Sequence, residues 1–139
     1  MSKPLIEVKD LKVYFKQKSP KLLSFKPGIL KAVDQVSFSI EKGKTFGLVG
    51  ESGSGKTTVI RAVLGLLAGG GKVTEGSITF EGEDLLSYTP EQWRKLRGSD
   101  ISMIFQDSGA MMNPTRKVGK VFTEYILTHE NIFQERGME

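Results

Sequence analysis

The chain has 139 residues, of which 38% are hydrophobic and 26% charged, and this length is enough for one domain with a real core. It contains no run of 18 or more apolar residues, which predicts no transmembrane helix, and residues 1–7 lack the apolar core of a signal peptide. The absence of cysteine excludes disulfides and thiolate metal sites and fits a reducing cytosol, and the formal net charge is +4.

The N-terminal third predicts antiparallel β structure. Leu5 to Phe15 alternates near its start and Ala32 to Ile40 alternates clearly, which predicts two half-buried strands that pair antiparallel. Prolines and glycine between them predict a loop over roughly Lys16 to Leu30. Its lysines are compatible with nucleic acid or an anionic membrane, but we interpret them as a solvated basic loop with no nucleic-acid partner.

The pattern changes after a predicted turn at residues 41–44. Thr45 to Val49 is a short apolar run, which predicts a strand buried on both faces of a parallel sheet. A Gly-rich loop follows, and apolar residues at helical spacing then predict a helix over Thr57 to Leu67. Three glycines at residues 69–71 are expected to end it.

The second half predicts a strand, two helices and another buried strand. Gly76 to Glu83 predicts a strand with a turn, and Ser87 to Arg97 predicts a short helix with Pro90 at its first position. Ile101 to Phe105 predicts a second buried strand. The last predicted helix, Lys117 to Ile132, has one apolar face, made of Val118, Val121, Phe122, Tyr125 and Ile126.

The Gly-rich loop carries the clearest functional signal. Its residues match the phosphate-loop pattern G-x-x-x-x-G-K-[ST] and are Gly50, Glu51, Ser52, Gly53, Ser54, Gly55, Lys56 and Thr57. Glycines allow the backbone to turn successive N–H groups toward phosphate oxygens. Lys56 is expected to reach the β- and γ-phosphates, the Thr57 hydroxyl to bind magnesium, and Thr58 to complete the nucleotide site. The predicted cofactors are therefore ATP and Mg²⁺.

Three stretches resemble ABC ATPases. The phosphate loop is similar to their Walker A sequence, residues 101–107 to their Q-loop strand, and residues 75–85 to their β-hairpin. Leu96-Arg97-Gly98, the Met-Ile-Phe-Gln-Asp run and Asn113-Pro114 resemble, more narrowly, the ATPase subunits of oligopeptide, dipeptide and nickel importers. The resemblance extends from about Leu5 to Tyr125.

This resemblance implies an α/β fold, an incomplete P-loop NTPase of the ABC ATPase type. Residues 1–45 would form a mainly antiparallel β region, residues 46–108 the P-loop core with hairpin and Q-loop strand, and residues 109–139 the start of a helical subdomain. Gln106 would be the Q-loop glutamine, which contacts magnesium and the attacking water and so acts in catalysis with Lys56. Phe15 would stack on adenine, with Tyr14 as the alternative.

The resemblance also implies partners. The loop of residues 107–115 would contact transmembrane permease subunits, and a second ABC ATPase subunit would complete the ATP site, so the protein would lie at the cytoplasmic face of the membrane. The loop departs from the family at Ser108, where a proline is usual, and at the following Gly-Ala-Met-Met.

The family's later motifs are absent from the sequence after Gln106: the Leu-Ser-Gly-Gly-Gln signature, the Walker B aspartate, the catalytic glutamate and the switch histidine. We therefore expect an N-terminal fragment of a longer importer subunit that binds ATP but does not hydrolyse it efficiently, and that self-associates through uncovered sheet edges. Two alternatives remain open. One is a small complete kinase with Asp107 as its Walker B residue, and the other is a non-catalytic nucleotide-binding module.

Overall fold

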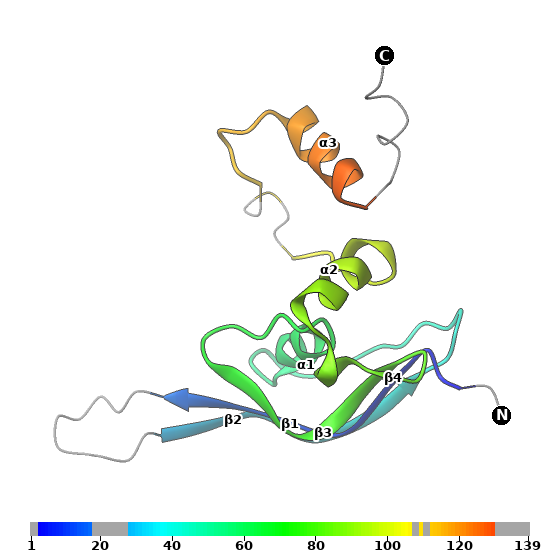
Figure 1. The fold of residues 1–139 in the computed structure, drawn as a ribbon. Helices are drawn as coiled ribbons and strands as arrows, with labels where there is room; N and C mark the ends of the chain where they lie inside the picture. Colours follow the sequence, from blue (N-terminus) through cyan, green and yellow to red (C-terminus); the bar gives the residue numbers. More distant parts are fainter. Residues whose placement is uncertain (1–2, 18–27, 107–108, 110–111, 130–139) are drawn as a thin grey trace, which may run out of the picture. The chain divides into compact units, whose positions relative to one another are not determined.

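The computed structural model describes residues 3–17, 28–106, 109 and 112–129, in two units, Met1–Thr89 and Pro90–Glu139. The first unit is built on a four-stranded antiparallel sheet in the order β2-β1-β3-β4 (Figure 1). Its strands are β1 (Ile6–Gln17), β2 (Gly28–Ile40), β3 (Gly71–Phe80) and β4 (Glu83–Asp84). The predicted antiparallel pairing of the first two strands is confirmed.

Both strands are longer than the sequence indicates. β1 continues to Gln17 and β2 begins at Gly28, so the pairing extends into the segment that was expected to be a loop. Residues 18–27 of that expected loop lie outside the described residues. The predicted turn at 41–44 is confirmed, and the Lys44 amide donates a hydrogen bond of 3.1 Å to the Glu41 carbonyl.

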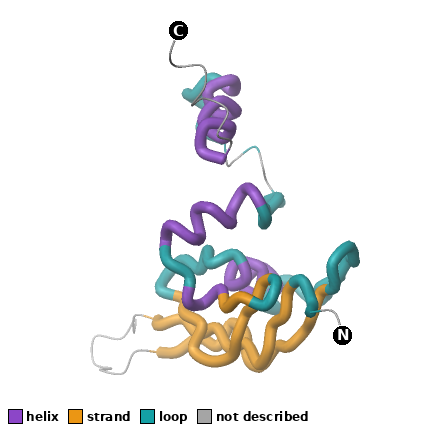
Figure 2. Tube along the Cα trace, turned by 45° about the vertical axis from the view of Figure 1, so that its right-hand side comes forward, coloured by secondary structure: helices purple, strands orange, loops and turns teal. Residues whose placement is uncertain are grey.

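The middle of the sheet is bent at β1. Asp10 has a positive φ of 47°, and the register of the β1–β3 pairing shifts between Lys9 and Lys12. Opposite this irregularity stands Gly76, where a Cβ would lie 2.5 and 2.6 Å from the carbonyl oxygens of Lys9 and Asp10. A bulge of this kind increases local twist, and the strands of the sheet are strongly curved in Figure 2.

One helix covers a face of this sheet. α1 (Lys56–Val63) lies on one side of the sheet in Figure 1 and contacts β1 and β2, and its buried residues include Val59 and Ala62. The helix ends about one turn before the predicted Leu67, and Gly71 begins β3 instead of terminating the helix. The core between helix and sheet consists of Val8, Leu11, Val13, Val33, Val59, Ala62, Val63, Leu64, Ile78 and Leu85.

The predicted strand with a turn is confirmed as a hairpin. β3 and β4 pair through Thr79 with Asp84 and Phe80 with Glu83, around a turn in which Glu81 and Gly82 both have positive φ. A short 3₁₀ helix, η1 (Leu85–Ser87), follows, with the Asp84 carboxylate accepting a hydrogen bond from the Leu86 amide.

The second unit contains two helices. α2 (Pro90–Ser99) has proline at its first position as predicted, but Arg97 and Gly98 leave the helical region within it. α3 (Val118–His129) confirms the last predicted helix up to His129, and residues 130–132 lie outside the described part. The Tyr125 hydroxyl of α3 donates a hydrogen bond of 2.7 Å to the Gly98 carbonyl of α2. The predicted apolar face of α3 is not buried, since its residue Phe122 is 62% exposed.

Two predicted strands are wrong in this structure. Residues 45–49 form no strand, and residues 101–105 make only an isolated bridge between Arg97 and Ile101. Val49 and Ile104 are each 93% exposed. An apolar run becomes a buried strand only where neighbouring strands supply hydrogen bonds and cover its faces, and no strand among the described residues pairs with either segment.

No helix in the described parts of the chain is both long enough and apolar enough to cross a membrane.

Replacement of Leu11 tests the core of the first unit. Leu11 is fully buried, so Leu11→Ala should lower the free energy of unfolding by about 2–5 kcal/mol, because a cavity remains where the side chain was removed. Leu86→Ala is the matched control, since Leu86 is 43% exposed, and it should cost about 0.5 kcal/mol or less. Urea unfolding followed by circular dichroism measures both, and equal losses would contradict this assignment of the core.

Candidate nucleotide site

The Gly-rich loop leads directly into the N-terminus of α1. Gly53 and Gly55 have φ of +80° and +93°, which side-chain-bearing residues rarely adopt, and Gly55 is the residue that caps the helix. The Ser54 amide donates to the Glu51 carbonyl at 3.2 Å, so the loop folds back tightly before the helix begins. The first N–H groups of α1 have no acceptor within the helix, and its first turn contains no acidic residue. This end of the helix therefore attracts anions.

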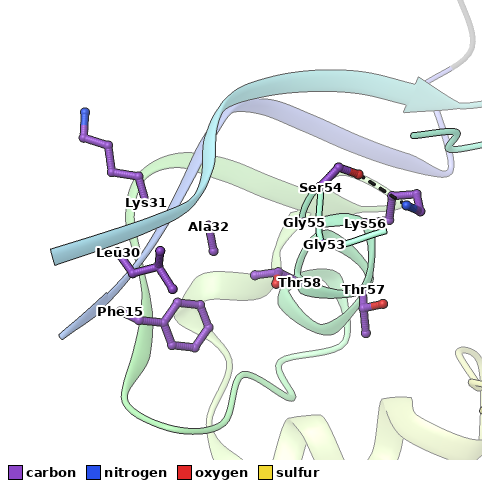
Figure 3. A pocket seen from close by; sticks show the side chains of 10 residues that line it. All are labelled: Phe15, Leu30, Lys31, Ala32, Gly53, Ser54, Gly55, Lys56, Thr57 and Thr58. Carbon is purple, nitrogen blue, oxygen red and sulfur yellow. Dashed lines mark hydrogen bonds between the residues drawn. The ribbon is translucent and has the colours of Figure 1, made fainter. Parts of the chain in front are cut away.

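Lys56 lies over the loop that precedes it. Its Nζ donates to the Gly50 carbonyl at 2.7 Å, to the Glu51 carbonyl at 2.5 Å and to the Ser54 hydroxyl at 3.3 Å. The last of these is the dashed line in Figure 3. The loop carbonyls thus hold the ammonium group beside the N-terminus of the helix, where an anion would meet it.

The loop rests on the sheet at one close approach. A Cβ at Gly55 would stand 2.4 Å from the backbone carbonyl oxygen of Ala32 in β2 and 3.6 Å from a methyl group of Val33. At Gly53 a Cβ would meet nothing within 4 Å. The two glycines therefore serve different purposes, since both permit a positive φ but only Gly55 lets the helix reach β2.

An apolar wall faces the loop from the ends of β1 and β2. Phe15 is paired with Leu30 in the register of the two strands, and in Figure 3 both side chains point to the same side, together with Ala32. Lys31 lies between Leu30 and Ala32 on β2, and its side chain points the other way in Figure 3. The alternation of a β-strand produces this separation.

The loop and the wall enclose a cleft of about 530 Å³, a volume typical of small-molecule sites. The residues that line it are Phe15, Leu30, Lys31, Ala32, Gly53, Ser54, Gly55, Lys56, Thr57 and Thr58. One end of the cleft is thus apolar and aromatic, and the other is lined by the Gly-rich loop, Lys56 and two threonines. A planar ring joined to phosphate groups matches this division.

The side chain of Tyr14 lies on the opposite face of β1 from that of Phe15. Its hydroxyl donates a hydrogen bond of 2.8 Å to Asp34, and the Lys31 ammonium lies 5.3 Å from the centre of its ring. The hydrogen bond from Tyr14 lowers the pKa of the Asp34 carboxyl, and Lys31 lowers it further. Tyr14 does not line the cleft, whereas its neighbour Phe15 does.

The remaining predicted loop residues lie to one side of the cleft. Gly50 lines a neighbouring cleft of about 340 Å³ together with Leu48 and Val49, and Glu51 and Ser52 line neither of the two. Leu30 and Ala32 were not predicted as site residues, because Leu30 was expected in the loop and Ala32 at the start of the strand. The structure extends this strand back to Gly28, so that Leu30 and Ala32 share one face of it.

Comparison with known proteins agrees with this geometry. A family model described as ABC transporter matches residues 33–136. The chain belongs to the ABC transporter family. The expected fold class, an α/β P-loop NTPase of the ABC ATPase type, is confirmed, and the described part of the chain presents its antiparallel sheet and helices.

Individual ABC relatives belong to peptide transport systems. The chain is 42% identical over 125 residues to the dipeptide transport ATP-binding protein DppD of Lactococcus lactis subsp. cremoris. This match covers 90% of the present chain and 34% of DppD. It is 42% identical over 137 residues to the oligopeptide transport ATP-binding protein AppD of Bacillus subtilis (97% and 39%). It is 44% identical over 128 residues to the oligopeptide transport ATP-binding protein OppF of Escherichia coli (91% and 37%). The chain thus spans between a third and two fifths of these relatives' length.

Gln106, the proposed Q-loop residue of this ABC chain, lies in the second unit. It is exposed and stands in a turn after the apolar segment 101–105. Its approach to the phosphate loop stays a prediction. In the expected permease-contacting loop, residues 107, 108, 110 and 111 lie outside the described residues. Asp107, the Walker B residue of the kinase alternative, is one of these four.

The donor groups of the cleft fit a magnesium nucleotide. Among the described residues no group of three or more His, Asp or Glu side chains could hold a metal ion by itself. Mg²⁺ commonly keeps several waters and takes one or two protein ligands together with substrate phosphates, which is compatible with the Thr57 hydroxyl beside a phosphate cradle.

Matched alanine variants test the contact between loop and sheet. Gly55→Ala and Gly53→Ala both force a side chain into positive φ, at about 1–2 kcal/mol each, but only Gly55→Ala also collides with the Ala32 carbonyl. Gly55→Ala should therefore destabilise the nucleotide-free chain by at least about 1 kcal/mol more than Gly53→Ala. Thermal unfolding monitored by circular dichroism measures the difference, and equal stabilities would show that the loop does not rest on β2 in this way.

Proposed function

We propose that this chain is the nucleotide-binding part of an ATPase subunit that powers an ABC importer of oligopeptides or dipeptides. The observation that carries the proposal is the cleft that joins the aromatic wall at Phe15 to the phosphate loop ending at Thr57. Family membership and the names of the relatives support the importer assignment, and they argue against a self-contained kinase.

In this proposal the nucleotide lies along the cleft. Adenine stacks on Phe15 beside Leu30, and the phosphates lie in the loop, where the N–H groups at the start of α1 and Lys56 neutralise their charge. To reach them, the ammonium of Lys56 turns from the loop carbonyls to the phosphate oxygens. Thr57 would hold magnesium, with Gln106 proposed as a second residue for it, and the ion would supply positive charge to the phosphates.

The partners follow from the same assignment. Residues 107–115 contact the permease subunits at the cytoplasmic face of the membrane, and a second ATPase subunit supplies the signature loop across the interface. The carboxylate that activates water in the family is not found in this sequence after Gln106. The 139-residue chain alone therefore binds ATP without efficient hydrolysis, because positioning and charge stabilisation provide most of the rate of phosphoryl transfer.

Removal of the lysine ammonium tests the phosphate end. Lys56→Ala should weaken MgATP binding by about 10- to 150-fold, since hydrogen bonds to charged groups contribute about 1.5–3 kcal/mol. Lys44→Ala is the control: it changes the net charge equally, its side chain is exposed, and it does not line the cleft. Isothermal titration calorimetry measures both, and unchanged affinity in Lys56→Ala would refute the assignment of the loop.

Two neighbouring residues test the base end. Phe15→Leu should weaken MgATP binding by about fivefold or more, because stacking of a base on an aromatic ring contributes about 1–3 kcal/mol. Tyr14→Leu removes a ring of similar size from the opposite face of β1 and should leave the affinity unchanged. Calorimetric titration of both variants decides the assignment, and a loss confined to Tyr14→Leu would transfer the stacking role to Tyr14.

A further inference from the structure

Phe15 lies between two different neighbours on the sheet. In the β1–β2 register it is paired with Leu30, and in the β1–β3 register it is paired with Gly71, the first residue of β3. Directly paired residues of an antiparallel sheet project to the same face with their Cβ positions about 4.5–5.5 Å apart. One side of the Phe15 ring therefore has a leucine as neighbour, and the other side has no side chain.

The ring occupies the space that a side chain at residue 71 would take. A Cβ added to Gly71 would lie 2.5 Å from Cε1, 2.6 Å from Cζ and 3.1 Å from Cδ1 of Phe15. Ordinary contact between carbon atoms begins near 3.5 Å, so the ring would have to withdraw from β3 by about 1 Å to admit even a methyl group.

Backbone conformation does not explain this glycine. Gly69 and Gly70, directly before it, have φ of +66° and +77°, and a Cβ at either would meet nothing within 4 Å. Gly71 has no such positive φ and is part of a strand, where glycine is otherwise disfavoured. Its contact with the Phe15 ring is the feature that distinguishes it from its two neighbours.

We propose that Gly71 is a positioning residue for nucleotide recognition, which holds the Phe15 ring in the plane and place where a base stacks on it. The inference rests on the proposed function, in which Phe15 forms the base end of the cleft. Gly71 does not line the cleft and acts only through the ring. A side chain at residue 71 would displace the ring away from β3 and toward Leu30, out of its place in the apolar wall.

The atoms that a Cβ at residue 71 would meet predict whether the Phe15 ring or the backbone moves. All three crowded atoms belong to the outer part of a half-buried side chain, and none belongs to the backbone. Gly71→Ala should therefore fold, with the strand pairing kept and the ring moved. Gly28→Ala is the matched control, because Gly28 also begins a strand paired with β1, and its Cβ would find only Gln17 atoms at 3.5 and 3.6 Å.

The test compares two ligands that share the phosphates and differ in the base. Magnesium complexes of ATP and of inorganic tripolyphosphate are titrated calorimetrically into the 139-residue chain and its variants. Gly71→Ala should weaken ATP binding about fivefold or more and leave tripolyphosphate binding unchanged. Gly28→Ala should change neither. In Phe15→Leu, addition of Gly71→Ala should cause no further loss of ATP affinity, because the ring through which it acts is gone.

Each contrary result has a distinct meaning. Equal weakening of both ligands, unchanged ATP affinity, or additive losses in the double variant would overturn the role of Gly71 while leaving the nucleotide site intact. A Gly71→Ala chain that does not fold would also overturn it, since the backbone and not the ring would then have yielded. An unsubstituted chain that binds neither ligand would overturn the proposed function and this inference with it.

Discussion

The close approach of Gly55 to the carbonyl of Ala32 brings together two parts of the chain with different side chains. On one side is the N-terminus of α1, which provides N–H groups, Lys56 and two threonine hydroxyls. On the other is the sheet, whose outer ends provide the apolar wall. Because no side chain intervenes at Gly55, the helix begins directly on β2, and residues of the loop and of the strands line one cleft.

The wall itself depends on strand alternation. Phe15 faces the cleft, and Tyr14 faces away and bonds to Asp34. A shift of one residue in the register of β1 would exchange these two aromatic rings, since successive side chains point to opposite faces. Uninterrupted pairing of residues 14–17 with β2 and of residues 13–15 with β3 holds that register, and the buried side chain of Val13 reinforces it.

Two apolar segments are exposed because no neighbouring strand pairs with them among the described residues. Residues 45–49 and 101–105 have the composition of central parallel strands, yet Val49 and Ile104 are almost fully exposed. A central strand is stable only with partners on both edges and cover on both faces. Among the described residues neither segment has such a partner, and both therefore stay exposed.

The sequence by itself determined the local features. The spacing of Gly50, Gly55, Lys56 and Thr57 predicts a phosphate loop. Alternation predicted the antiparallel pair that the structure confirms, and the resemblance to ABC ATPases predicted the family that comparison confirmed. These features depend on residues close together in the chain, whose conformational preferences can be read from residue type and period.

Only the tertiary structure decided which residues meet across the fold. It placed Phe15 and not Tyr14 on the cleft and added Leu30 and Ala32 to the apolar wall. It also brought Gly71 of β3 next to the ring of Phe15. It also left two apolar segments unpaired. Such outcomes depend on register and on the presence of partner strands, which are properties of long-range contacts and are not encoded in any one segment.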